Sequence, residues 1–151
     1  MAVTTPTLPP TSLYIIAPSF HAGDELVLSP RNKVSVTPSY TLPLPDTIGA
    51  VTLAATYTFT GTQLSNYQDR TEPALAQYAY LPATKLLNLN ANWTNIVGKP
   101  IDLSLFVTNV TGEHYYTFCS GLGGIPGSNG FETCQVGAPM MFGARVRIRY
   151  H

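Results

Sequence analysis

Charge is scarce in this 151-residue chain. Charged residues make up 11% of it, whereas a typical soluble domain has about 25%. Eight basic and eight acidic residues give a net charge of zero. A protein that binds nucleic acid usually carries a strong positive field, so we expect no nucleic-acid partner.

Long apolar runs are missing as well. No segment approaches the roughly 20 apolar residues of a membrane-spanning helix. The first basic residue is Arg31, so the N-terminus lacks the positively charged region of a secretion signal. We therefore expect a chain that lacks its own signal peptide and is a piece of a longer protein.

Catalytic and cofactor-binding motifs are absent too. His21, His114 and His151 have no serine or carboxylate at a recognisable catalytic spacing, and no phosphate-cradling glycine motif is present. We expect neither enzymatic activity nor a cofactor.

The clearest positive feature is an alternating pattern at the C-terminus. Between residues 142 and 150 apolar side chains alternate with glycine and three arginines, Arg145, Arg147 and Arg149. A period of two predicts a strand, because successive side chains leave opposite faces. One face of that strand suits water and the other an apolar environment.

Four further segments alternate in the same way, over residues 33–42, 51–60, 87–94 and 101–108. Pro38 is the exception within the first, since proline in a strand is usually confined to an edge or a bulge. Short turns at 43–49 and 97–100 follow the first and third strands. Long connections at 61–82 and 111–139 follow the second and fourth.

This order predicts an all-β fold, namely an antiparallel transmembrane β-barrel fragment of about five C-terminal strands. Short periplasmic turns and long extracellular loops are typical of such barrels, as are strands of about ten residues. Residues 1–30 contain five prolines and are interpreted as a Pro-rich loop or disordered leader, and residues 31–151 as the barrel portion. The smallest bacterial barrels have about eight strands, so five would be only the last part of one.

Two other interpretations remain open. The apolar faces can meet in the core of a soluble β-sandwich, a binding module with recognition carried on its loops. A third possibility is an adhesin-like barrel that closes by oligomerisation.

Several motifs resemble one family. The chain is similar to the last strands of TonB-dependent outer-membrane receptors, which have a comparable Val-x-Asn-hydrophobe block and aromatic pair before the last loop. The similarity covers about Gly23 to Tyr150 and rests on Gly23-Asp24-Glu25-Leu26, Pro30-Arg31-Asn32-Lys33, Lys85 to Trp93, Gly98 to Thr111 with Tyr115 and Tyr116, and Gly137 to Gly143.

The resemblance implies a plugged barrel of about 22 strands in the outer membrane of a Gram-negative cell. Such receptors take up siderophores, cobalamin or oligosaccharides with energy passed on by the TonB protein. The implied partners are outer-membrane lipid, the remainder of the barrel and plug, and the TonB system. The family usually ends in an aromatic residue, whereas this chain ends in His151 after Tyr150.

Two cysteines, Cys119 and Cys134, flank a glycine-rich part of the last long connection. On the extracellular side they are candidates for a disulfide, which would stabilise a loop of this size by about 3 kcal/mol. Metal binding together with His114 is the rival interpretation, although the spacing is not that of a metal site.

Polar and aromatic residues supply the remaining candidates. We expect Arg145, Arg147 and Arg149, with Asn88, Asn90 and Asn92, to face the barrel lumen, and a ligand or nucleic-acid patch is the alternative. Tyr115 and Tyr116 are candidate loop contacts to a ligand, because aromatic rings stack on sugars and aromatic ligands. They fit an interfacial aromatic girdle equally well.

Overall fold

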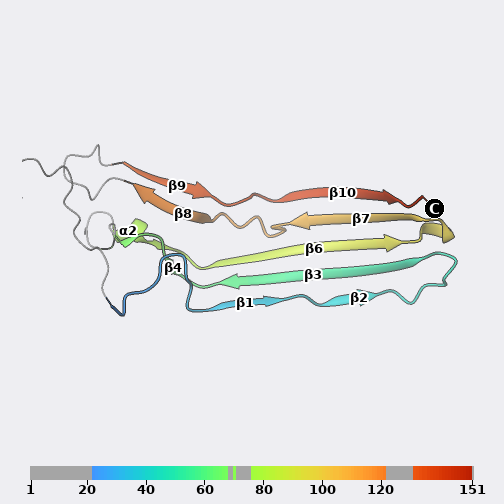
Figure 1. Cartoon of the computed structure of the whole chain (residues 1–151), viewed down its shortest axis with the longest axis horizontal. Coiled ribbons are helices and arrows are strands. Elements are labelled where there is room, and N and C mark those ends of the chain that lie inside the picture. Colours follow the sequence, from blue (N-terminus) through green and yellow to red (C-terminus); the bar gives the residue numbers. More distant parts are fainter. Residues whose placement is uncertain (1–21, 68–69, 71–75, 122–130, 151) are drawn as a thin grey trace, which may run out of the picture.

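A computed structural model describes residues 22–67, 70, 76–121 and 131–150. Its main element is a long antiparallel sheet with the order β1-β3-β6-β7-β10, in which β2 also pairs with β3 (Figure 1). The strands of this sheet are β1 (Lys33–Val36), β2 (Ser39–Thr41), β3 (Ala50–Thr60), β6 (Thr84–Thr94), β7 (Ile101–Thr108) and β10 (Met141–Ile148).

The all-β prediction is confirmed at this coarse level. Each segment predicted from alternation forms a strand within a few residues of the expected bounds, and β7 matches them fully. The described strands form an open sheet rather than a closed barrel, and none of them pairs with the outer edge of β1 or β10. Among the described residues no helix is long and apolar enough to cross a membrane.

Pro38 divides the first predicted strand into β1 and β2. The pairing of Lys33 with Thr60 and of Ser39 with Ala54 keeps one register across the break. The Ala55 amide donates to the Pro38 carbonyl at 3.1 Å. Proline has no N–H to return that bond, so one link of the ladder is lost on this outer strand.

The sheet has one apolar and one largely polar face. Directly paired residues share a face, and the register aligns apolar with apolar, as in Val51 with Trp93 and Val146 with Leu103, except at the loop end, where Lys85 pairs with Phe59. We call this set the apolar face: Val34, Val36, Tyr40, Val51, Leu53, Ala55, Tyr57, Phe59, Leu87, Leu89, Ala91, Trp93, Ile101, Leu103, Leu105, Val107, Phe142, Ala144, Val146 and Ile148.

The opposite face is mostly hydroxyl, amide and charged groups, and we call it the polar face. Cross-strand hydroxyl pairs run along it, including Ser35 with Thr58 at 3.2 Å and Thr41 with Thr52 at 3.0 Å. Its main residues are Lys33, Ser35, Ser39, Thr41, Thr52, Thr56, Thr58, Thr60, Asn88, Asn90, Asn92, Asp102, Ser104, Arg145 and Arg147.

Both short turns lie at the same end of the sheet, which we call the turn end. The turn between β6 and β7 contains a short 3-10 helix, η1 (Ile96–Gly98). It packs against the other turn, where the Trp93 indole N–H and the Val97 amide both donate to the Ile48 carbonyl. Gly49 permits this approach, because a Cβ there would lie 2.3 Å from the Thr94 oxygen.

The two long connections lie at the other end, the loop end (Figure 1), and they contain structure that the sequence did not predict. The first holds β4 (Gln63–Leu64), the four-residue helix α2 (Ala76–Ala79) and β5 (Tyr80–Leu81). The second holds the hairpin of β8 (Tyr116–Gly121) and β9 (Glu132–Val136), which extends the line of β7 and β10.

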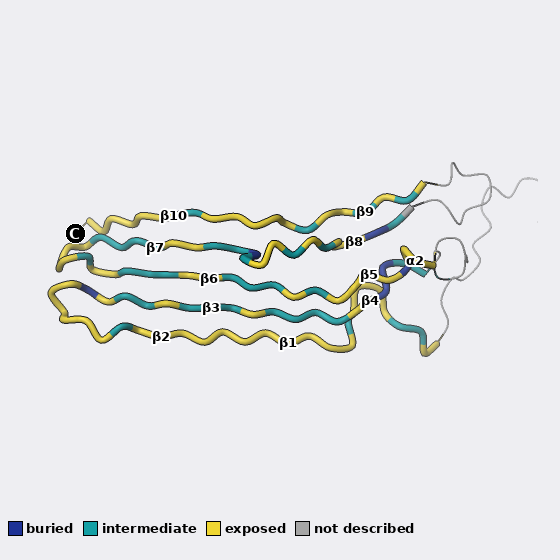
Figure 2. Tube along the Cα trace, turned by 180° about the vertical axis from the view of Figure 1, so that it is seen from behind, coloured by how far each residue is buried: buried dark blue, intermediate teal, exposed yellow. Residues whose placement is uncertain are grey.

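Most of the buried residues lie toward the loop end (Figure 2). Four of the five side chains in its buried cluster come from the first long connection, and the fifth comes from β8: Leu64, Ser65, Ala79, Leu81 and Cys119. The long sheet has no comparable core, because its apolar face is open to the surroundings.

Candidate functional site

Cys119 on β8 lies directly opposite Cys134 on β9 in the hairpin that these two strands form. The structure joins them by a disulfide across 15 residues of sequence. Both sulfurs are therefore engaged. In the part of the chain that is described, no group of three His, Cys, Asp or Glu side chains could hold a metal ion.

Ser65 connects this hairpin to the first long connection. Its hydroxyl donates to the Cys119 carbonyl at 2.5 Å and accepts the Cys119 amide at 2.8 Å. The Asn66 side-chain amide adds a contact to the same carbonyl at 3.3 Å. Ser65 is fully buried. These hydrogen bonds therefore hold the two long connections together at a point that water does not reach.

The segment before β1 also packs against the first connection. The Leu28 amide donates to the Leu64 carbonyl at 2.8 Å, and Arg70 forms an ion pair with Asp24 at 3.1 Å. That hydrogen-bonded carboxylate raises the pKa of Arg70, and the guanidinium lies over the Tyr67 ring. Residues 22–32 form no helix or strand. Residues 1–21, the first part of the leader predicted over residues 1–30, lie outside the described residues.

Asn109 marks the point where the chain leaves β7. It has a left-handed backbone, φ 50°, and is buried. Its side-chain amide donates to the carbonyls of Glu113 and Ala138, and its side-chain oxygen accepts the Glu113 amide. Its own amide donates to the Asn88 side chain at 2.9 Å. Asn109 therefore holds β7, β6 and the start of β10 together.

The predicted lumen residues share the polar face, as the alternation requires. Arg149 follows β10 and forms an ion pair with Asp102 at 2.9 Å. Arg145 and Arg147 are exposed and form no ion pair within the described ranges. Asn92 lies between Thr52 and Ser104, and Asn90 between Ala54 and Phe106. Whether this face lines a lumen stays a prediction.

Tyr115 and Tyr116 border one hollow of about 240 Å³ at the loop end. The other residues that line it come from the segment before β1, from β1, β3, β4, β6 and β8 and from the turn between β5 and β6: Leu28, Pro30, Lys33, Thr60, Gln63, Pro82, Thr84, Leu86 and Thr117. The sequence suggested the two tyrosines but not their neighbours. We call this the loop-end hollow.

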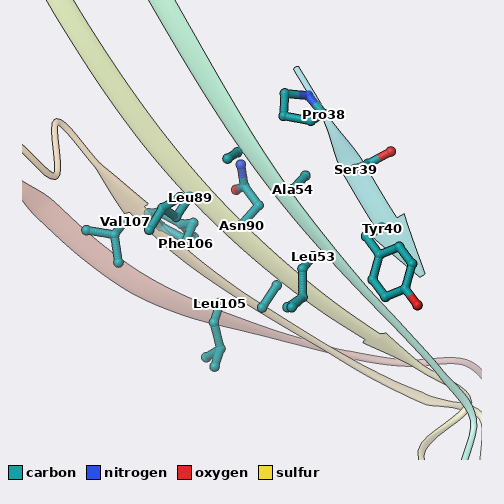
Figure 3. Close-up of a pocket in the computed structure, with 12 residues that line it drawn as sticks. Pro38, Ser39, Tyr40, Leu53, Ala54, Leu89, Asn90, Leu105, Phe106 and Val107 are labelled. Atoms are coloured by element: carbon teal, nitrogen blue, oxygen red, sulfur yellow. The ribbon is translucent and has the colours of Figure 1, made fainter. Parts of the chain in front are cut away.

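A second, larger hollow of about 510 Å³ lies over the middle of the sheet (Figure 3). Leu53, Leu89 and Leu105 stand around it with Tyr40 and Val107, and the small side chains of Ala55 and Ala91 leave space between them. It is a depression in the apolar face, open to whatever covers that face.

No known protein family, curated protein or solved structure matches this chain in the comparisons.

Ser65 and Lys33 are the residues of this region that sequence reasoning missed. Ser65 acts through a contact 54 residues away in the chain, for which the sequence carries no local pattern. The alternation predicted only that Lys33 lies in a strand. Its position at the end of the polar face, beside the first connection, was the signal that could have identified it as a site residue.

Proposed function

We propose that this chain is the C-terminal part of a TonB-dependent receptor barrel in the outer membrane. The whole receptor would take up a scarce nutrient such as a siderophore, cobalamin or an oligosaccharide. The observation that carries the proposal is the uncovered apolar face. Large side chains on it are widely exposed, including Phe142 at 82%, Val146 at 62% and Val36 at 55%. A continuous exposed apolar surface marks a partner or a membrane.

The dimensions of this face support a lipid environment. Trp93 near the turn end and Lys85 near the loop end are eight residue steps apart on β6, or about 27 Å at roughly 3.4 Å per residue. A strand tilted by about 40° would then cross roughly 20 Å, close to the apolar band of about 25 Å in such barrels. Lys85 near one end of the apolar face and Trp93 near the other are residue types that suit the two membrane–water interfaces.

The arrangement of connections supports the same proposal. All short turns lie at one end and all long connections at the other (Figure 1), which is typical of outer-membrane barrels. A soluble sandwich would need a second sheet over the apolar face. The two small described sheets, β4–β5 and β8–β9, lie beyond the end of the main sheet instead.

Closure by identical copies is less favourable than closure by further strands of one receptor. β1 and β2 form one row beside β3, so the sheet has five antiparallel rows and its two outer rows run in the same direction. Joining β10 of one copy to β1 of the next would require parallel pairing at every junction. Bacterial barrels of this kind are antiparallel throughout.

A pair of neighbouring arginine substitutions tests the proposal. Leu89 lies midway along the apolar face, and Asn90 follows it on the polar face. We expect the full chain to float with vesicles of phosphatidylethanolamine and phosphatidylglycerol. Leu89→Arg should lose this association, because arginine near the midplane costs about 2–4 kcal/mol, and Asn90→Arg should behave as wild type. A soluble, cooperatively unfolding monomer that ignores vesicles would refute the membrane assignment.

A further inference from the structure

We propose that the loop-end hollow binds one carboxylate-bearing sugar unit, such as a uronic acid residue of an oligosaccharide. This inference rests on the proposed function, which leaves the nutrient unspecified between a siderophore, cobalamin and an oligosaccharide. It narrows the ligand to an acidic glycan and assigns the residues that would recognise it.

The walls of the hollow are held in place before any ligand arrives. The segment carrying Leu28 and Lys33 is attached by the Leu28 amide to Leu64 and by the Gly61 amide to the Asn32 carbonyl, both at 2.8 Å. The opposite wall, the start of β8, is fixed through the Ser65–Cys119 hydrogen bonds and the disulfide. A preformed site avoids much of the entropic cost of ordering loops on binding.

Polar groups converge on this space without engaging one another. Lys33, Thr60 and Thr84 lie in one row of the polar face, as their register shows, and Gln63 stands beside them. No hydrogen bond among the described residues uses these four side chains. They are therefore available to the alternating donors and acceptors of a sugar ring.

The charge of the hollow favours an anion. Lys33 is the one charged residue among the described residues that line it. The nearest acidic residues of the adjoining segment are already paired, Asp24 with Arg70 and Glu25 with Arg31. An ammonium group among neutral hydroxyl and amide groups would select a ligand that carries a carboxylate.

An aromatic wall completes the site. The Tyr115 ring lies directly over Gly137, where a Cβ would come within 2.2 Å of the ring. Glycine at this position therefore allows the ring to lie close against the end of β9, and the same ring belongs to the lining of the hollow, where a sugar can stack on it. The volume of about 240 Å³ is below the roughly 300–1,000 Å³ of drug-sized sites, which suits a single ring.

Binding of a short oligogalacturonate to the full chain in detergent tests the inference. We expect calorimetry to show at least about tenfold tighter binding of trigalacturonate than of its methyl-esterified, uncharged form, because a hydrogen bond to a charged group contributes that much. Lys33→Met should abolish this preference. Lys85→Met is the matched control, since Lys85 pairs with Phe59 on the apolar side of the neighbouring rows, and it should leave binding unchanged.

A second variant tests the aromatic wall. Tyr115→Ser should weaken trigalacturonate binding about tenfold, because the ring on which the sugar stacks is lost. The circular dichroism spectrum of the variant should match that of the wild type. Equal binding of the charged and esterified forms, equal loss in Lys33→Met and Lys85→Met, or tighter binding of salicylate than of galacturonate would overturn the inference. A chain that floats with vesicles but binds no galacturonate would refute this inference alone, whereas a chain that does neither would also refute the proposed function.

Discussion

Asn109 shows how much of the architecture depends on a single side chain. It occupies a left-handed backbone position, which asparagine tolerates better than most residues. Its three side-chain hydrogen bonds replace the ladder that ends after β7. The sequence motif containing Asn109 was one of the features that suggested a receptor family, and the structure supplies a physical reason for asparagine at that position.

Asn109→Ala should lower the free energy of unfolding by about 3 kcal/mol, from the loss of three hydrogen bonds at about 1 kcal/mol each. Urea titration in detergent would measure it. Asn109→Gly separates the backbone from the side chain, because glycine adopts positive φ freely but makes none of these bonds. We expect Gly to be less destabilising than Ala. Wild-type stability in both variants would show that the bonds contribute nothing.

Residue patterns predicted the faces of the sheet well, for a simple reason. Alternation fixes which side chains share a face, and a slip of one residue would reverse the whole set. Val146, Arg147 and their neighbours therefore fell on the expected faces. Ser65 and Cys119 are 54 residues apart in the sequence and meet only in the folded chain. The alternation of neighbouring residues carries no information on such a contact.

At the scale of elements, the β8–β9 hairpin is a separate unit that extends from the main sheet. The sequence predicted only a long connection here, because five- and six-residue strands with Gly, Ser and Cys show little alternation. The two cysteines were the one usable signal. A disulfide requires the two Cα atoms to lie within about 7 Å, which indicates that the two halves of this connection meet but not that they form strands.

The double variant Cys119→Ser/Cys134→Ser should loosen this hairpin and leave the main sheet intact. A disulfide that closes a loop of about 15 residues contributes about 3 kcal/mol. Hydrogen exchange should speed up in β8, β9 and around Ser65, but not in β3 or β6. Reducing the wild-type protein with dithiothreitol should reproduce the pattern. A free-thiol mass in the unreduced protein would contradict the disulfide.

At the scale of the whole molecule, no described strand pairs with the outer edge of β10. The Arg149 amide donates inward to the Pro100 carbonyl at 2.9 Å, and N–H groups alternate in direction along an antiparallel strand. The Arg147 N–H therefore points toward β7 and the Val146 N–H away from it. Such an edge is a template for another strand.

Two proline substitutions distinguish the two sides of β10. Val146→Pro removes an outward N–H, so the sheet should keep its stability while association between chains in detergent decreases. Arg147→Pro removes an inward ladder bond and should destabilise the sheet by about 1–3 kcal/mol, because a backbone acceptor of β7 loses its partner. Analytical ultracentrifugation and urea unfolding provide the two readouts. If Val146→Pro associates as wild type does, the edge is not the contact surface.

The order of the strands also has a consequence for how the molecule folds. With β1 and β2 counted as one row, every neighbour in the main sheet is the next row along the chain, so each pairing closes a hairpin, two of them across long connections. Pairing across a long connection is slow, because the entropy of closing the loop is lost before the strand contacts form. The sheet can form one hairpin at a time, and the two hairpins that close over long connections, β3 with β6 and β7 with β10, should be the slow steps.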